Sequence, residues 1–375
     1  MMKIDEKTRR AIDRCIDINL PFALILLPGD DSPLFFASVP DTDDDYRNVW
    51  ESKNQDWRGF IINFFANDEE YTAGIRAELS ADGVLKIADS LEGMLPPTWT
   101  PLQKRQTEKF KYISLVNGVI ERLKRDGGKT VISRIETVES DRDINDVAEE
   151  YFNLFPNTFR YLCFTQETGL WLGATPEILA RISDDTIETM ALAGTMKTRS
   201  HRQWDQKNLD EHNLVVGFIL SCLSGAGAQI DKDIETTELK FGSIKHLCTP
   251  IRAKLDLNDK DKREFLTRLS PTPAVGGFPR EKALPEIFIN ETHERLCYGG
   301  FVGLITPGAS MAYVNLRCAM AAKTEKGYTY NIYSGGGITA ESIAADEWDE
   351  AVSKVRPLNE IIKGKVSDNQ AANKS

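Results

Sequence analysis

The chain of 375 residues contains 41% hydrophobic and 27% charged residues and carries a formal net charge of −11. This composition is typical of a globular protein, long enough for a large core in one domain or two. The negative charge argues against a nucleic-acid-binding protein, which normally carries a basic stripe. It also means that a site for a small anion needs local Arg or Lys side chains, or a metal cation.

The cysteines and the N-terminal apolar stretch indicate the cellular compartment in which the protein is expected. Six cysteines are scattered without a C-x-x-C pair, which predicts reduced thiols and no zinc site. The stretch Leu20–Leu27 is too short to span a membrane and lacks a cleavage pattern. We therefore expect a cytoplasmic protein with no membrane or nucleic-acid partner.

The first hundred residues predict a short helix followed by apolar runs at Phe22–Leu27 and Phe60–Phe65. The acidic segment 41–46 between these runs is expected to be a loop. The prolines of Leu95–Pro101 predict a linker, because proline continues neither a helix nor a central strand.

The rest of the chain alternates predicted helices and strands. Apolar residues at helical spacing predict a helix over Phe110–Leu123, which Gly127 and Gly128 would end. The next predicted elements are a strand at Lys129–Arg134, a hairpin of Tyr161–Phe164 and Leu170–Gly173, and a helix over 205–223. A loop is predicted over 271–278, with Pro279 as the first residue of the next helix. Strands are then predicted at 301–305, 312–319 and 328–333, followed by a helix over 344–362 and a disordered tail over 363–375. Paired strands mixed with long helices predict an α+β fold with antiparallel sheets.

The last predicted helix carries Glu347, Glu350 and Lys354 on one face. These residues form either a solvated surface or a carboxylate–ammonium cluster beside a cleft. The glycines of Ser334–Ile338, expected between a strand and this helix, favour the cleft, because their backbone amides can approach an anion.

Glu211 shares a predicted helical face with Leu214, Val215 and Phe218. A carboxylate on an apolar face needs a partner, because its burial alone is costly. Mg²⁺ would serve, since it takes oxygen ligands. A Lys or Arg partner, or exposure at the start of the helix, would also explain the residue.

Other candidates each have a structural alternative. Lys129 is either a surface charge or a buried general base with a lowered pKa, and Glu177 follows a proline and is expected to start a helix. His246 is either a structural histidine or part of a site. Arg317, inside the predicted apolar strand Tyr313–Ala319, either binds a carboxylate or makes a structural salt bridge.

In order along the chain, these segments resemble the chorismate-utilising enzymes, which include isochorismate, salicylate, anthranilate and aminodeoxychorismate synthases. The matching stretches are Lys129–Arg134, Gly173–Glu177, Leu192–Thr195, Asp210–His212, Lys245–Leu247, Pro271–Arg280, Tyr298–Gly300, Arg317, Ser334–Ile338 and Glu347–Glu350. The resemblance implies large antiparallel sheets packed together, with helices outside and an active-site cleft between them. It also implies a catalytic region over 104–362 and a variable N-terminal part over 1–103.

Two positions favour water as the nucleophile. Lys129 matches the lysine with which isochorismate and salicylate synthases activate water, and Ala193 stands where some aminodeoxychorismate synthases carry a nucleophilic lysine. The resemblance thus implies an isomerase, an isochorismate synthase that adds water at carbon 2 of chorismate while Glu177 protonates the hydroxyl leaving carbon 4. It implies Mg²⁺ held by Glu211 and Glu350, with Glu347 nearby. It implies substrate contacts from Thr195, His246, Ala274, Tyr298, Arg317, Gly335 and Lys354.

The sequence departs from the family pattern at three places: Ser270, Met190–Leu192 and Ser334–Gly337. None of them removes a proposed catalytic group. The alternatives are a salicylate synthase, an ammonia-dependent anthranilate-type enzyme, which Lys129 disfavours, and a chorismate-binding module without activity. No amidotransferase subunit is expected, and a monomer and a homodimer both remain open. Menaquinone and catechol siderophores both begin at isochorismate, so the pathway is open too.

Overall fold

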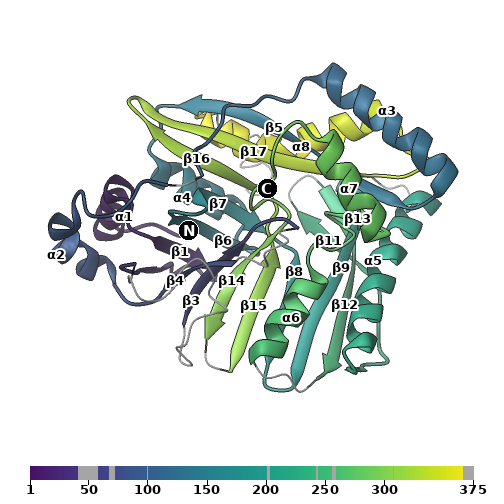
Figure 1. The fold of residues 1–375 in the computed structure, drawn as a ribbon, viewed down its shortest axis with the longest axis horizontal. Helices are drawn as coiled ribbons and strands as arrows, with labels where there is room; N and C mark the ends of the chain where they lie inside the picture. The colour runs from purple at the N-terminus through teal and green to yellow at the C-terminus, as the bar shows by residue number, and fades with distance from the viewer. Residues whose placement is uncertain are drawn as a thin grey trace.

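Two antiparallel sheets pack face to face and form the interior of the fold, with helices on their outer faces (Figure 1). The computed structural model describes residues 1–40, 58–66, 72–98, 100–200, 203–241, 244–255, 259–306 and 308–365. The helices within these ranges are α1 (Glu6–Ile18), α2 (Ala81–Leu91), α3 (Lys109–Asp126), α4 (Ile144–Leu154), α5 (Gln206–Gly225), α6 (Asp259–Leu269), α7 (Arg280–Asn290) and α8 (Ala344–Ile362).

The strands form one sheet of eight and one of nine, counted over the described ranges. The first sheet has the order β13 (Gly277–Phe278), β5 (Lys129–Ser140), β17 (Gly327–Ile338), β16 (Cys318–Thr324), β7 (Gly169–Thr175), β6 (Phe159–Thr165), β1 (Phe22–Leu26) and β2 (Leu34–Ala37). The second has the order β10 (Gln229–Ile230), β12 (Ile244–Lys254), β9 (Thr186–Lys197), β8 (Ile178–Ser183), β15 (Ala309–Val314), β14 (Phe301–Thr306), β3 (Gly59–Asn63) and β4 (Thr72–Arg76), and β11 (Thr237–Phe241) pairs with β12.

Strand β1 shows why the apolar runs are continuous. Phe22 and Leu24 pack toward the helices on the outer face of the first sheet, whereas Ala23 and Ile25 point toward the second sheet. Successive side chains of a strand point to opposite faces, so a strand in the middle of a layered fold needs apolar residues at both sets of positions.

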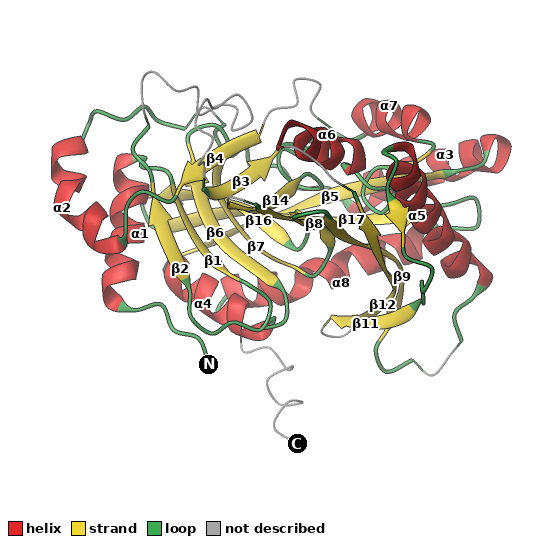
Figure 2. Cartoon of the chain, turned by 90° about the horizontal axis from the view of Figure 1, so that it is seen from below, coloured by secondary structure: helices red, strands yellow, loops and turns green. Residues whose placement is uncertain are grey.

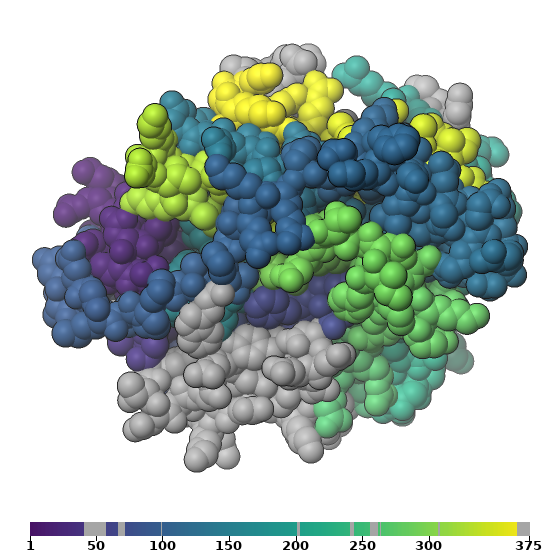
Figure 3. All heavy atoms as spheres, turned by 45° about the horizontal axis from the view of Figure 1, so that its top comes forward, coloured from purple at the N-terminus to yellow at the C-terminus, as the bar shows by residue number. Residues whose placement is uncertain are grey.

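Helices cover both outer faces. Helices α1, α4 and α8 share one core with the first sheet, and α5 and α6 share another with the second. Figure 2 places α1 and α2 at one end of the sheets and α3, α5 and α7 at the other. On the face drawn in Figure 3, the blue residues of α3 lie between the yellow C-terminal residues and the green ones of α7.

Two of the connections that pass from one sheet to the other lie next to each other, those between β7 and β8 and between β15 and β16, and they are called the two crossovers below. Val314 joins the crossovers, because its carbonyl accepts from Thr175 Oγ1 at 2.6 Å and its N–H donates to the carbonyl of Glu177 at 2.9 Å. Two predictions are therefore wrong. Glu177 lies in a crossover and not in a helix, and the expected strand over 312–319 is broken before Arg317, whose φ of 51° lies in the left-handed region.

Most other predicted elements are confirmed, including the α3 and α8 helices, the β6–β7 hairpin and the strands β5, β14 and β17. Pro279 is the N-cap of α7 and not its first helical residue. Elements that were not predicted include the helices α2, α4 and α6 and the strands β9 and β12. The acidic segment 41–46 and residues 366–375 of the expected tail lie outside the described residues.

The six cysteines are buried and free, as expected for reduced thiols. Among the helices of the described ranges, none is long and apolar enough to cross a membrane.

Candidate active site

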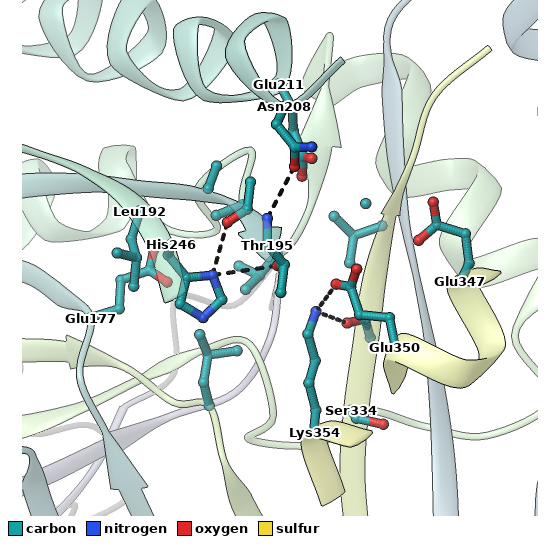
Figure 4. A pocket seen from close by; sticks show the side chains of 18 of the residues that line it. Glu177, Leu192, Thr195, Asn208, Glu211, His246, Ser334, Glu347, Glu350 and Lys354 are labelled. Carbon is teal, nitrogen blue, oxygen red and sulfur yellow. Dashed lines mark hydrogen bonds and ion pairs between the residues drawn. The ribbon is translucent and has the colours of Figure 1, made fainter. Parts of the chain in front are cut away.

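A pocket opens at one end of the layer between the sheets, with about 1050 Å³ of space that includes its mouth. Strands β5, β9, β12 and β17, helices α5 and α8, the 271–278 loop and both crossovers contribute to its walls. All twelve site residues predicted from the sequence line it, namely Lys129, Glu177, Thr195, Glu211, His246, Ala274, Tyr298, Arg317, Gly335, Glu347, Glu350 and Lys354. Figure 4 shows Glu211 on α5 and Glu347 and Glu350 on α8 reaching into this space.

Lys129 is the first residue of β5 and is only 1% exposed. Strand β13 fixes its backbone, because Phe278 is its register partner. Its Nζ lies 2.8 Å from Glu211 Oε1, so the carboxylate on the apolar face of α5 has a lysine partner. The surface alternative for Lys129 is therefore wrong.

The three glycines at 335–337 lie inside β17 and are paired with β5, so the expected turn between a strand and a helix is wrong. Their role is to leave space. A Cβ on Gly337 would lie 2.5 Å from both Lys129 Cε and Glu211 Oε1, and one on Gly336 would lie 2.9 Å from Glu347 Oε2. Both distances are too short for heavy atoms, so the charged side chains occupy the positions that side chains on β17 would fill.

Glu177 is 1% exposed, and no hydrogen-bond partner of its Oε1 is found within the described residues. Burial raises the pKa of this carboxyl to about 8, although the charge of Lys129 and the hydroxyl of Thr272 act in the opposite direction. Glu177 is thus protonated at neutral pH, and it is a carboxylic acid able to donate a proton into the pocket.

His246 on β12 is held on one side of the pocket. Its Nδ1 lies 2.9 Å from the carbonyl oxygen of Gly194 and 3.4 Å from Thr195 Oγ1 (Figure 4). Burial, with help from the charges of Arg317 and Lys354, lowers the pKa of His246 to about 3, so the ring is neutral. A neutral ring that donates from Nδ1 to the Gly194 carbonyl leaves Nε2 as an acceptor.

Asn208 fixes this side of the pocket to α5. Its Oδ1 accepts from the N–H of Thr195 at 3.1 Å, and its Nδ2 donates to the N-cap residue Asp205 at 2.6 Å. The sequence did not single out Asn208, because its partner belongs to a distant strand.

Two lysines neutralise the carboxylates of α8. Lys354 Nζ lies 2.6 Å from Glu350 Oε1 and donates to the carbonyl of Gly335 at 2.9 Å. Lys207 Nζ donates to Glu347 Oε1 at 2.8 Å. Burial alone would raise the pKa of Glu350, but Lys354 lowers it, whereas burial raises the pKa of Glu347. Lys207 was missed, although its position four residues before Glu211 puts both side chains on one helical face.

Tyr298 and Arg317 form the wall near the second crossover. Tyr298 is buried and stacks on Tyr333 with ring centroids 5.5 Å apart. The Arg317 guanidinium donates to the carbonyl of Lys354 at 3.2 Å, and burial lowers its pKa. Ala274 and Val275 belong to the neighbouring 271–278 loop and also line the pocket.

The charges of the described lining residues set what the pocket can bind. Five carboxyl groups (Glu177, Asp205, Glu211, Glu347 and Glu350) face four cations (Lys129, Lys207, Arg317 and Lys354). With Glu177 protonated and His246 neutral, the two signs balance. A doubly charged anion would then leave an uncompensated charge of about −2 in a partly buried site, unless a divalent cation enters with it.

The residue types fit such a cation, because carboxylate oxygens on two facing helices are the ligands that Mg²⁺ prefers. In the part of the chain that the structure describes, no three acidic, histidine or cysteine side chains are gathered as a ligand group. Glu211, Glu347 and Glu350 are instead paired with Lys129, Lys207 and Lys354.

Comparisons with known proteins show what the whole chain is similar to. A family model described as "Chorismate binding enzyme" matches residues 50–363. The isochorismate synthase MenF of Haemophilus influenzae is 27% identical over 318 residues, which cover 81% of this chain and 71% of that protein. The isochorismate synthase MenF of Bacillus subtilis is 29% identical over 53% of this chain, and the match spans less than half, 44%, of its length.

Among solved structures, MenF, the menaquinone-specific isochorismate synthase from Escherichia coli, has the same fold. It superposes with a TM-score of 0.72 at 21% identity, over 93% of this chain and 91% of that one.

Proposed function

Because the chain belongs to the family of chorismate-binding enzymes, we propose that it is an isochorismate synthase that converts chorismate to isochorismate reversibly. The observation that carries this proposal is the pair of Lys129 and Glu177, an amine and a protonated carboxylic acid buried in the walls of one pocket.

The two residues supply the two proton transfers of the reaction. Lys129, once its ammonium has given up a proton, accepts a proton from water as the water oxygen bonds to ring carbon 2. The two ring double bonds shift, the bond from carbon 4 to its hydroxyl breaks, and Glu177 gives its proton to the departing oxygen. One water enters and one leaves, so the reaction is an isomerisation. The protonated lysine and ionised glutamate that remain are in the states that the reverse reaction needs. Each such proton transfer contributes about 10²–10⁴-fold.

Substrate binding uses the cationic and polar wall. Arg317 and Tyr298 are proposed to hold the pyruvyl carboxylate, because a buried guanidinium favours a carboxylate partner. Thr195, His246 and Ala274 shape the site around the ring, Gly335 contributes backbone contact, and Lys354 lies beside the proposed metal ligands.

Glu211 and Glu350, with Glu347 nearby, are proposed to hold Mg²⁺. The metal, when bound, would supply positive charge for the ring carboxylate of the substrate. Among the residues themselves, Lys207 opposes the effect of burial on Glu347 and holds its carboxylate in place, and Lys354 does the same for Glu350.

The test is a product assay. Purified protein is incubated with chorismate and Mg²⁺ without ammonia, and the products are separated by mass. The expected result is isochorismate without pyruvate, lost on chelation and restored by Mg²⁺. Salicylate with pyruvate would instead make the protein a salicylate synthase, and the absence of turnover would leave a binding role.

A further inference from the structure

Arg295 lies directly behind the pocket wall, is 4% exposed and is not among the residues that line the cavity. Its Nη1 donates to the carbonyl of Val275 at 2.8 Å, and its Nη2 donates to the carbonyl of Val131 at 2.7 Å. Both valines line the pocket. One guanidinium thus bonds β5 to the 271–278 loop from behind.

Glu291 holds this guanidinium from the other side. Arg295 Nε donates to Glu291 Oε2 at 2.9 Å and Nη2 donates to Oε1 at 2.6 Å, and both side chains are at most 3% exposed. Burial alone would raise the pKa of Glu291, but Arg295 lowers it below its ordinary value. Glu291 Oε1 also accepts from the N–H of Ser133 on β5 at 2.6 Å.

The groups that Arg295 joins carry the proposed chemistry. Val131 follows Lys129 by two residues on β5. Val275 follows Thr272, the hydroxyl beside Glu177, by three residues in the loop. The backbone of Arg295 also accepts from the N–H of Tyr298 at 2.9 Å, and its guanidinium carbon lies 5.9 Å from the centre of the Tyr298 ring.

We propose that Arg295, oriented by Glu291, is a positioning residue that fixes the strand of the base Lys129 against the loop beside the acid Glu177. This assignment rests on the proposed function. A buried ion pair is weak support for stability, because an apolar pair of similar size often stabilises a fold as well. Two carbonyl acceptors from different walls of one pocket require the planar fork of arginine and not only its charge.

The test compares Arg295→Lys with Arg160→Lys. Arg160 is a matched control, because it is fully buried and donates to four backbone carbonyls, those of Leu27, Asp30, Phe152 and Thr158, outside the pocket. Thermal unfolding, kcat, KM and the pH dependence of kcat/KM are measured for both variants and the wild type.

We expect Arg295→Lys to lower kcat by about 10- to 100-fold with a smaller change in KM, because small displacements of catalytic groups cost that much. The alkaline limb of its pH profile should move to lower pH, since a loosened loop admits water to Glu177. The groups that face Glu177 are Lys129 from β5, Thr272 from the loop and Cys248 from β12. Arg160→Lys should lower the unfolding temperature and leave both kcat and the alkaline limb of the pH profile unchanged.

Glu291→Gln is a second variant in case Arg295→Lys does not fold, and it should show a smaller loss of kcat in the same direction. The assignment of Arg295 would be overturned if the folded Arg295 and Glu291 variants kept the wild-type kcat and the wild-type alkaline limb. It would also be overturned if the Arg160 variant lost as much kcat as they do. Neither result would affect the proposed function. An inactive wild type would overturn the proposed function, and the assignment with it.

Discussion

The layer between the two sheets is packed at one end and open at the other, although the same strands run through both. Toward the packed end, β5 contributes Ile135 to a cluster of aromatic and aliphatic side chains, and its register partner Tyr333 on β17 belongs to this cluster while also lining the pocket. In the open end, the inward positions of the same strands include Lys129, Gly335 and Gly337. The backbone pairing does not change, so this pocket arises from side-chain size and charge at inward positions.

The largest test of this difference removes the proposed base. Lys129→Ala should lower kcat by at least about 100-fold, because no proton acceptor would remain for the attacking water. The measurement is turnover of chorismate by the folded variant. Lys245→Ala is the control, because Lys245 is also buried and paired, with Glu238 at 2.8 Å, but lies outside the pocket. Full turnover in the Lys129 variant would show that the base is misassigned.

The next test uses the acid. Since burial raises the pKa of Glu177 to about 8, the donating form is lost above that pH and kcat/KM should fall there. The sign for stability is the same. The unfolded carboxyl ionises near 4.5, so the contribution of Glu177 to folding declines from about pH 4.5 to about 8. Glu177→Gln should lose about 100-fold in kcat and also lose the alkaline limb, and a limb that persists in this variant belongs to another group.

A smaller effect is expected from a single methyl group. Gly337→Ala places a Cβ 2.5 Å from Lys129 Cε, so the lysine must move, and kcat should fall by about 10-fold. Gly118→Ala in α3 is the control, because a Cβ there meets nothing within 4 Å. That variant should keep its activity and gain up to about 1 kcal/mol of stability. Unchanged kcat in the Gly337 variant would mean that the open space is not needed.

A substitution in the packed end should lower stability strongly and have the smallest effect on turnover. Phe159 stacks on Tyr313 with ring centroids 4.5 Å apart. Phe159→Ala should lower the free energy of unfolding by about 3–5 kcal/mol, because it leaves a cavity. Denaturant unfolding measures this loss, and kcat below the unfolding temperature should stay near that of the wild type. A comparable loss of kcat would show that the two ends are coupled.

The sequence predicts the elements and the residues that line the pocket better than it predicts the local backbone around the pocket. Helical spacing identifies the charged face of α8, and ordered motifs identify Lys129 and Glu177. The break before Arg317 is hidden, because apolar residues lie on both sides of it and only the strand pairing shows that the chain changes sheet there. The role of Gly337 is hidden for a similar reason, since a glycine that makes room for Lys129 looks the same as a glycine in a turn.

Long-range partners are hidden most completely. Arg295 and Glu291 look like two charges on a polar segment, and their value depends on carbonyls from β5 and from the 271–278 loop. No periodicity within the segment records those acceptors. Lys207 is the exception, since its spacing from Glu211 is visible in the sequence itself.

The pairing of β5 with β17 also determines how early this part of the fold can form while the chain is being synthesised. Thr130 pairs with Ile338, about 200 residues further along the chain. At about 5–20 residues per second, a ribosome needs roughly 10–40 s to make that interval. During this time β5 has no β17 beside it, so the contact between Lys129 and Gly337 has not yet formed. A nascent chain therefore cannot complete this pocket before its last strand and the α8 helix that follows it have emerged.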